Sequence, residues 1–192
     1  MTSVTIFGSG NMGTAIGDVL TAGGATVEHL TTSAAPGTPI NGDIVILAVP
    51  YSALGEIAVA YGDQLAGKVV VDVTNPLNLE TFDSLAVPAD SSAAAELAAA
   101  LPESEVLKAF NTNFAATLAA KSVGANKTTV LIAGDDAEAK STLADAVQAG
   151  GLEAVDAGSL NRAAELEALG FLQLKLALAE QVSWTSGFAL VR

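Results

Sequence analysis

The segment Val4–Leu20, VTIFGSGNMGTAIGDVL, is the feature that most constrains the fold. A short β-branched apolar run is followed by Gly8, Gly10 and Gly13 and then by an apolar pattern of helical period. Between a strand and a helix, glycines at this spacing allow a tight turn, a close approach of a pyrophosphate and close packing of the helix on the strand. Free N–H groups at the helix start would face the phosphate oxygens. The spacing predicts a dinucleotide-binding turn rather than a glycine-rich turn without a ligand.

Apolar runs typical of buried strands alternate with helical patterns along the rest of the chain. Strands are predicted at 4–7, 25–31, 43–49, 68–74, 105–110, 128–134 and 152–157. Helices are predicted at 11–22, 52–64, 91–102, 135–149 and 161–183. This alternation predicts an α/β, Rossmann-like, doubly wound and mainly parallel sheet with a long C-terminal helix. We expect residues 1–158 to form the dinucleotide-binding domain and residues 159–192 to form a helical extension.

Two segments depart from the alternation. Between residues 31 and 42 two prolines and two glycines exclude a proper helix, so a loop is expected there. The segment 161–183 has leucines and a phenylalanine on more than one face, and such a helix is usually buried against a neighbour in the same chain or in a second one. We expect a homodimer with this helix, Trp184 and Phe188 in the interface.

The composition excludes several classes of protein. The chain has 192 residues and a formal net charge of -13, which argues against binding to nucleic acid or to an anionic membrane surface. It has no cysteine and a single histidine, His29, so disulfides, thiolate catalysis and a metal site are not expected. The longest apolar run, IVILAVP, is far shorter than the ~18 residues of a membrane span, and the N-terminus has no targeting pattern. We expect a cytoplasmic protein.

The end of the second predicted strand normally selects between NAD and NADP. An acidic residue there binds the ribose 2′-hydroxyl, whereas an arginine binds the 2′-phosphate. This strand ends in Thr31, Thr32 and Ser33, and the nearest acid, Glu28, comes too early. Three hydroxyls can bind a phosphate without repelling it. NADP is therefore mildly favoured, and NAD stays possible.

Several blocks of sequence, taken together, resemble one family. GSGNMGTAI resembles the start of pyrroline-5-carboxylate reductases. With VVVDVTNPLN (69–78), SSAAAELAAALPESEVLKAFNT (91–112), IAGDDAEAK (132–140) and VDAGSL (155–160), the chain is similar to the NADPH-dependent reductases of the deazaflavin coenzyme F420 and to the dinucleotide-binding oxidoreductases around them. The resemblance covers nearly the whole chain.

The resemblance implies roles for the matching positions. The turn at 9–12 corresponds to the pyrophosphate site, 31–32 to a Ser-Arg pair at the 2′-phosphate whose arginine is missing here, and 47–51 to a strand end under the nicotinamide ribose. Residues 75–76 correspond to the turn beside the nicotinamide ring, and 112–115 to a segment over its amide. With the glycine spacing, this gives as cofactor-binding residues Gly8, Ser9, Gly10, Asn11, Met12, Gly13, Thr31, Thr32, Ser33, Val49, Pro50, Tyr51, Asn75, Pro76, Thr112 and Ala115. Leu77 and Asn111 are the candidates for contact with the second substrate.

Several of these residues also have a structural interpretation. The alternative interpretation is that Pro50 and Pro76 only end strands and that Asn111 and Asn113 form turns. Asp135 and Asp136 are interpreted as the start of a helix, and His29, which lies within a strand, as structural.

The absence of an evident acid–base constellation is consistent with hydride transfer between two rings, which needs no side-chain base. The first hypothesis is an NAD(P)H-dependent oxidoreductase that transfers hydride between a nicotinamide and a flavin-like or deazaflavin partner such as F420, with no catalytic side chain. The second is an imine reductase of the pyrroline-5-carboxylate reductase type, although that family has a helical C-terminal domain of roughly another hundred residues. The third is a non-catalytic module that senses NAD(P).

Overall fold

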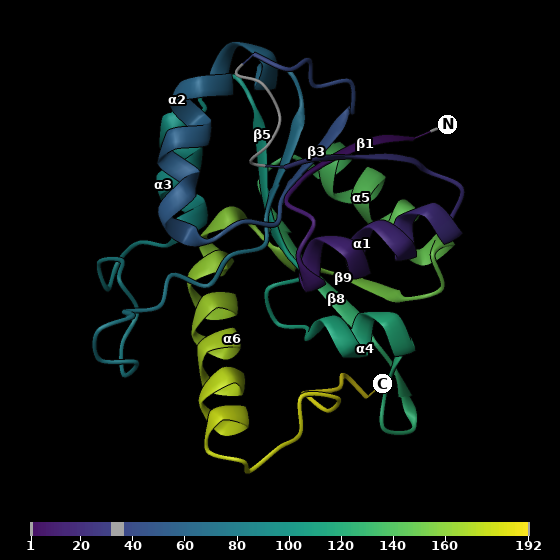
Figure 1. Cartoon of the computed structure of the whole chain (residues 1–192), viewed down its shortest axis with the longest axis vertical. Helices are drawn as coiled ribbons and strands as arrows, with labels where there is room; N and C mark the ends of the chain where they lie inside the picture. The colour runs from purple at the N-terminus through teal and green to yellow at the C-terminus, as the bar shows by residue number, and fades with distance from the viewer. Residues whose placement is uncertain (1, 32–36, 192) are drawn as a thin grey trace.

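A seven-stranded sheet forms the centre of the molecule in the computed structural model, which describes residues 2–31 and 37–191 (Figure 1). In spatial order the strands are β2 (Thr26–Leu30), β1 (Ser3–Phe7), β3 (Ile44–Leu47), β4 (Val69–Asp72), β5 (Glu105–Ala109), β8 (Thr129–Gly134) and β9 (Glu153–Gly158). The first five are parallel to one another, β8 is antiparallel to β5, and β9 is parallel to β8. The prediction of a Rossmann-like, mainly parallel sheet is confirmed, and the reversal at β8 is its exception.

Helices cover both faces of the sheet (Figure 1). One face carries α1 (Asn11–Ala22), α4 (Ala115–Ala120) and α5 (Ala137–Ala149), and the other carries α2 (Leu54–Leu65) and α3 (Ala93–Ala100). Each face has its own apolar cluster. The strands β3 and β4 contribute to both clusters, with neighbouring residues on opposite faces. The remaining elements are η1 (Tyr51–Ala53), β6 (Ser122–Val123), β7 (Asn126–Lys127), η2 (Leu160–Arg162) and α6 (Ala163–Leu178).

The starts of two helices follow from their sequence. The Ser92 hydroxyl caps α3 by accepting a hydrogen bond from the Ala95 N–H at 3.0 Å, and the Asp136 carboxylate caps α5 by accepting one from the Ala139 N–H at 2.7 Å. Asp135 accepts a hydrogen bond from the Leu160 N–H at 2.9 Å. Asp136 therefore has the capping role that the sequence suggested, whereas Asp135 precedes the helix and binds the start of η2.

The buried face of α6 differs from a typical amphipathic helix. It consists of small and polar residues together with one leucine: Ala163, Leu166, Glu167, Gly170, Gln173 and Ala177. The side chains of Leu172 and Leu178 are half exposed, at 50% and 52%. The helix ends at Leu178, so the predicted extension to residue 183 is wrong. Residues 179–182, although free of glycine and proline, form turns and bends after the helix.

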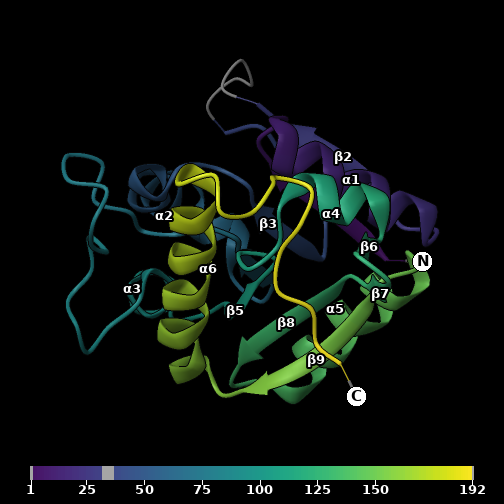
Figure 2. The ribbon, with the colours of Figure 1, turned by 90° about the horizontal axis from the view of Figure 1, so that it is seen from below.

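The segment after α6 turns back toward the body of the molecule (Figure 2). The Phe188 N–H donates to the buried Gln173 side-chain oxygen at 3.1 Å, and the Trp184 ring lies 5.1 Å from the Phe114 ring, centroid to centroid. This C-terminal tail, residues 179–191, therefore packs beside the start of α4. No helix within the described residues is both long enough and apolar enough to span a bilayer.

Candidate functional site

The three glycines of the turn between β1 and α1 have different structural roles. Gly8 has a left-handed backbone with φ 102°, and a Cβ on it would collide with the Ala48 carbonyl oxygen. A Cβ on Gly13 would lie 2.6 Å from the Gly8 carbonyl oxygen, so α1 can approach β1 only at a glycine. A Cβ on Gly10 would meet no atom within 4 Å. Backbone atoms of the fold therefore occupy the space beside Gly8 and Gly13, whereas the space beside Gly10 is open.

The open side of this turn lies at the start of α1. Ser9, Gly10 and Asn11 are exposed and Met12 is partly exposed. No side chain in the described part of the chain caps this helix, whose first bond runs from the Thr14 N–H to the Gly10 carbonyl at 2.9 Å. The unused N–H groups and the helix dipole together favour an anion at this position.

His29 supports the turn from the neighbouring strand. Its Nδ1 donates to the Gly8 carbonyl oxygen over 2.9 Å, because a carbonyl can only accept. The structural interpretation of this residue therefore agrees with its contact.

A cavity of about 430 Å³ lies beside the turn, beyond the carboxyl ends of the first strands. Among its lining residues are Gly8, Thr31, Val49, Pro50, Ile57 and Tyr61. The volume is within the range of small-molecule sites, and the position is where dinucleotides bind in sheets of this topology. Thr31 belongs to this cavity, whereas Thr32 and Ser33 lie outside the described residues. The loop predicted for residues 31–42 is therefore described only in part. Its described residues after 36 contain no helix.

Glu28 is not available to this cavity. Its carboxylate accepts hydrogen bonds from the Thr5 hydroxyl at 2.6 Å and from the Asn41 backbone N–H at 3.1 Å. The Thr5 bond is the main cause that holds the pKa of Glu28 below its usual range, with burial acting against it. The acid therefore joins Thr5 of β1 to the loop before β3, which agrees with the prediction that it does not bind the ribose.

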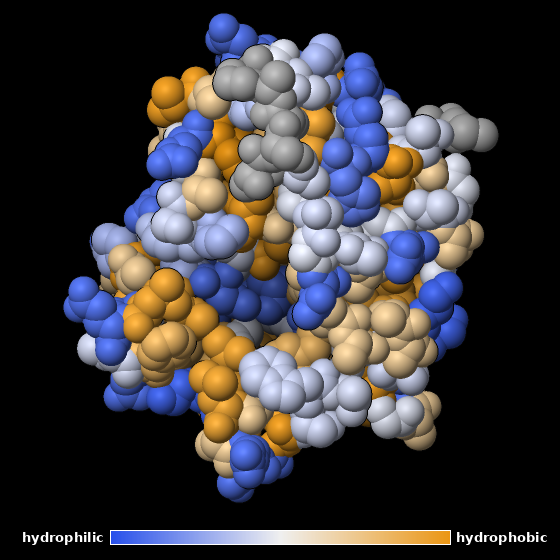
Figure 3. Space-filling view, in the orientation of Figure 1, coloured by the Kyte–Doolittle hydropathy of each residue, from blue (hydrophilic) through white to orange (hydrophobic). Residues whose placement is uncertain are grey.

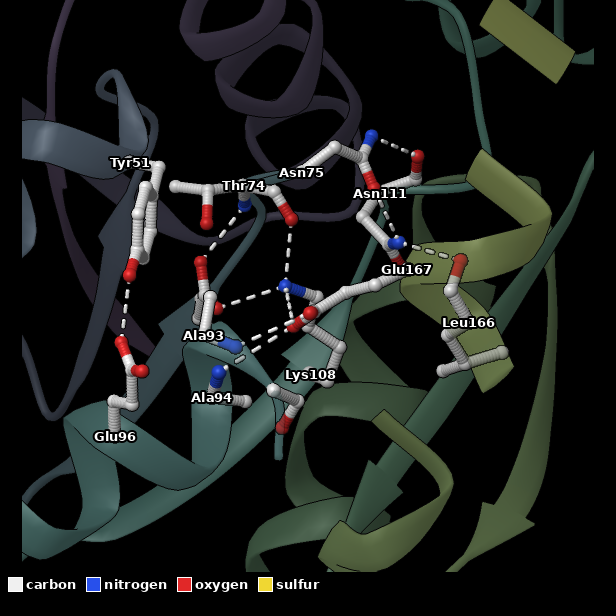
Figure 4. A network of polar contacts seen from close by, with 12 residues as sticks. Tyr51, Thr74, Asn75, Ala93, Ala94, Glu96, Lys108, Asn111, Leu166 and Glu167 are labelled. Atoms are coloured by element: carbon white, nitrogen blue, oxygen red, sulfur yellow. Dashed lines mark hydrogen bonds and ion pairs between the residues drawn. The ribbon is translucent and has the colours of Figure 1, made fainter. Parts of the chain in front are cut away.

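Tyr51 points away from the glycine turn. Its hydroxyl donates to Glu96 on α3 at 2.7 Å, and this bond, followed by burial and the charge of Glu96, raises the pKa of Tyr51 to about 12 (Figure 4). The residue lines a separate groove of about 340 Å³ between α2 and α3. Of the segment 49–51, Val49 and Pro50 thus share the cavity with the turn and Tyr51 does not.

Two asparagines join the carboxyl ends of β4 and β5 (Figure 4). Asn75 Nδ2 donates to the Asn111 carbonyl oxygen at 2.9 Å, and Asn111 Nδ2 donates to Asn75 Oδ1 at 2.9 Å and to the Leu166 carbonyl oxygen of α6 at 2.8 Å. Pro76 and Leu77 continue this turn, and Leu77 forms an isolated antiparallel bridge with Leu85. The structure therefore brings together four residues that the sequence assigned to the nicotinamide ring and the second substrate.

Buried polar atoms gather at the same edge. Thr112 is buried, and Asn113 Nδ2 donates to the Thr129 carbonyl oxygen at 3.0 Å. Four buried side-chain atoms have no hydrogen-bond partner among residues 2–31 and 37–191: Thr74 Oγ1, Asn111 Oδ1, Asn113 Oδ1 and Thr129 Oγ1. Thr129 belongs with the others because β8 is antiparallel to β5 and starts where β5 ends. Such unpaired atoms are rare in native interiors and call for a partner.

Sequence reasoning missed a buried ionic cluster below this edge. Lys108 Nζ lies 2.8 Å from Asp72 Oδ2 and 2.7 Å from Glu167 Oε1, and all three side chains are fully buried. Burial is the main cause that raises the pKa of Glu167, and the nearby Lys108 opposes the shift. A signal was present in the sequence: Asp72 and Lys108 each interrupt an apolar strand, and they are direct partners in the β4–β5 register.

The face of the molecule that is seen in Figure 3 is hollowed. Figure 3 shows a depression near its centre with hydrophilic residues on the floor, and hydrophobic residues along the rim over α6 and the loop beside it. The loop is residues 73–92, and Lys175 of α6 donates to its Phe82 carbonyl oxygen at 2.8 Å. The apolar rim is therefore held in place by a polar contact.

Comparison with known proteins places the chain. No family model matches it. It is 39% identical to the rat metalloreductase STEAP3 over 130 residues, which is 66% of this chain and 25% of the rat protein. It is 33% identical over 132 residues to an F420-dependent NADP reductase from Methanocaldococcus jannaschii, which covers 67% of this chain and 59% of the archaeal protein. The chain thus spans a quarter and somewhat over half of the lengths of these two relatives.

Solved structures share the fold over greater lengths. A proposed F420-dependent NADP reductase from Arthrobacter sp. FB24 has a TM-score of 0.85, with 22% identity and 100% coverage of both chains. A pyrroline-5-carboxylate reductase from Coxiella burnetii has a TM-score of 0.59 with 17% identity, over 94% of this chain and 70% of that one. The sequence relatives and the fold agree with the resemblance found in the motifs, and the archaeal homologue is an oxidoreductase. The chain is thus similar in sequence, over 132 residues, to an F420-dependent NADP reductase, and it shares its fold with the Arthrobacter structure and with a pyrroline-5-carboxylate reductase.

Proposed function

We propose that this chain binds NADP(H) at the carboxyl edge of its sheet and transfers hydride between the nicotinamide and a flavin-like or deazaflavin partner. The observation that carries the proposal is the glycine turn. Gly8 and Gly13 are occupied by the fold itself, whereas Gly10 faces open space at an uncapped helix start, which is what a pyrophosphate requires.

The residues at the far end of the edge fit a nicotinamide. A carboxamide offers two N–H donors and one carbonyl acceptor. The unpaired oxygens of Asn111 and Asn113 are acceptors, and the Thr74 and Thr129 hydroxyls can donate, so the two sets are complementary. In this proposal Asn75, Pro76, Thr112 and Ala115 flank the ring, while the segment 9–12 holds the pyrophosphate.

When bound, the cofactor supplies the hydride chemistry, and the chain orients two rings and excludes water. The side chains that gather at the β4–β5 edge are amides and hydroxyls, which suit orientation rather than proton transfer. Leu77 and Asn111 are the proposed contacts of the second ring. The names of the archaeal relative and of the Arthrobacter structure support a deazaflavin as that ring.

The experiment is anaerobic NADPH oxidation with a panel of acceptors: F420, FMN, riboflavin, a cyclic imine and a ferric chelate. The chelate is included because the rat relative is named a metalloreductase. Turnover with F420 or a flavin is expected. Turnover with the imine alone would favour the imine reductase alternative, and NADPH binding without any turnover would favour the sensor.

For cofactor choice, NADPH is proposed to bind more tightly than NADH by a small factor, because hydroxyls replace the charge-assisted arginine contact. Thr31 lines the cavity beside the turn, so Thr31→Asp is expected to reverse the preference by repelling the 2′-phosphate, and Thr32→Arg to increase it. Calorimetric titration of both cofactors measures this. A wild-type preference for NADH of tenfold, about 1.4 kcal/mol, would contradict it.

The chain is further proposed to form a homodimer through α6. Leu172 and Leu178 of this helix are half exposed, and Leu79 of the loop beside it is 70% exposed, which leaves an apolar surface uncovered. Residues 159–192 are then the extension that meets both the domain and its partner. Light scattering is expected to give the mass of a dimer at micromolar concentration, and Leu172→Lys is expected to shift it to a monomer.

A further inference from the structure

The buried ionic cluster of Asp72, Lys108 and Glu167 contains two carboxylates and one ammonium (Figure 4). Lys108 Nζ contacts both carboxylates and donates to the Thr74 carbonyl oxygen at 2.6 Å, so its three N–H groups are used. Asp72 also accepts from the Thr74 N–H at 2.8 Å, and Glu167 from the Ala93 N–H at 3.1 Å and the Ala94 N–H at 3.4 Å. The partners of both carboxylates are all donors, which is the arrangement that two ionised groups need. Lys108 and the Ala93 N–H favour the ionised form of Glu167 against the burial that raises its pKa, and with both carboxylates ionised the cluster carries one surplus negative charge.

That surplus is only partly neutralised. The start of α3, which donates to Glu167, is equivalent to roughly half a positive charge. The three side chains are 0% exposed, so dissolved ions screen the remainder poorly. Buried ionic clusters are often no more stable than apolar side chains of the same shape, so stability alone is a weak reason for this one.

The cluster is attached to the proposed nicotinamide site. It holds both peptide groups of Thr74, since the N–H donates to Asp72 and the carbonyl accepts from Lys108. The next residue is Asn75, which pairs with Asn111 at the strand ends. The negative charge thus lies against the residue next to the turn that is proposed to flank the ring.

We propose that the Asp72–Lys108–Glu167 cluster favours the oxidised, cationic form of a bound nicotinamide over the neutral reduced form and so promotes hydride donation. Transfer of a hydride, one proton with two electrons, to the acceptor ring leaves one positive charge on the nicotinamide. A fixed negative charge below the ring lowers the free energy of that cation and leaves the neutral form almost unaffected. The inference rests on the proposed function.

The test compares the dissociation constants of NADP⁺ and NADPH, measured by calorimetry without any acceptor. Glu167→Gln keeps the shape of the side chain and removes the surplus charge. Its expected effect is to weaken NADP⁺ binding relative to NADPH by about three- to tenfold, the size expected for one charge at short range in a partly polarisable interior. Glu165→Gln is the matched control, because Glu165 lies on the same helix but is exposed and paired with Arg162. This control is expected to leave the ratio as in the wild type.

Asp72→Asn provides a second variant in case Glu167→Gln does not fold, as judged by circular dichroism, and it should move the ratio in the same direction. The wild type provides a further measurement: NADP⁺ is expected to bind at least as tightly as NADPH, and a preference for NADPH beyond about tenfold would overturn the proposal whichever variants fold. An unchanged ratio in folded Glu167→Gln would overturn it too. If the wild type bound neither form, the proposed function itself would fall, which distinguishes the two failures.

Discussion

Phe110 adopts a left-handed backbone conformation, φ 64°, with its ring completely buried where β5 ends. Its carbonyl oxygen accepts a hydrogen bond from the Asn113 N–H at 3.0 Å, which closes the turn that carries Asn111. A non-glycine residue in this region costs about 1–3 kcal/mol and persists only where its surroundings determine it. Here the buried ring and the Asn75–Asn111 hydrogen bonds hold the backbone of Phe110 in this conformation. The position of Asn111 is thus maintained against a local preference.

The glycine turn gives a prediction that separates binding from folding. Gly10→Val places its side chain in open space with φ at -72°, so the fold should keep its thermal stability while NADPH binding is lost. Gly13→Val should instead lower the melting temperature, because its Cβ would press on the Gly8 carbonyl. Calorimetry with NADPH and thermal unfolding of both variants measure the contrast. Undiminished NADPH binding by Gly10→Val would remove the turn from the proposed site.

Tyr51 gives a pH prediction. A tyrosine has a pKa of about 10 in an unfolded chain, and the Glu96 bond raises that of folded Tyr51 to about 12. Above pH ~10 the unfolded chain ionises this group first, so its contribution to stability is present below that pH and is lost as the pH rises toward about 12. Tyr51→Phe should flatten this loss in urea unfolding experiments across the range. Tyr61→Phe keeps the Tyr51–Glu96 bond and serves as the control; equal alkaline slopes in all three proteins would contradict the prediction.

At the scale of elements, α6 approaches the site through a glycine. A Cβ on Gly170 would lie 2.5 Å from Asn75 Oδ1 and 2.8 Å from the Asn111 carbonyl oxygen. Gly170→Ala should therefore destabilise the protein, although alanine favours helices by about 1 kcal/mol. Gly62→Ala in α2 is the matched comparison, because its Cβ would find only an ordinary contact of 3.8 Å with Leu101, and it should stabilise by up to about 1 kcal/mol. Free energies of unfolding in urea for both variants decide between packing and propensity.

The sequence predicted those elements whose pattern is local. The bounds of α1 agree because a glycine turn precedes it and another glycine follows. The parallel core agrees because β3 is a continuous apolar run and β4 begins with three valines. The helix α4, six residues long, and the two-residue strands β6 and β7 were missed, since such lengths carry no measurable period. The direction of β8 was missed because the alternation of side chains along a strand is the same in either direction.

The candidate site divides in the same way. The glycine turn and the Asn75 and Asn111 positions follow from motifs, and the structure brings the two asparagines within hydrogen-bonding distance. The pairing of Lys108 with Glu167 joins residues far apart in sequence, on β5 and α6, so no local spacing could reveal it. The engagement of Tyr51 by Glu96 likewise depends on how α3 packs beside η1.

At the scale of the whole molecule, the charges are strongly unbalanced. Twenty-one acidic and eight basic residues give a net charge of -13, and this self-repulsion destabilises the compact state. Raising the salt concentration from a few millimolar to about 1 M should therefore raise the melting temperature. Sodium chloride and choline chloride should act alike if screening is the cause. A melting temperature independent of both salts would show that the repulsion is already compensated within the fold.

The contact between Trp184 and Phe114 has an optical consequence. The chain has one tryptophan, Trp184. Its ring packs against Phe114, which precedes α4 and follows Thr112 by two residues. The emission of an indole overlaps the absorption of a reduced nicotinamide, but not that of an oxidised one. Excitation energy absorbed at Trp184 can therefore pass to a reduced ring bound at this edge and to no other chromophore of the cofactor. Under the proposed NADP(H) binding, Trp184 is thus a native donor fluorophore whose emission falls with the reduced cofactor and not with the oxidised one.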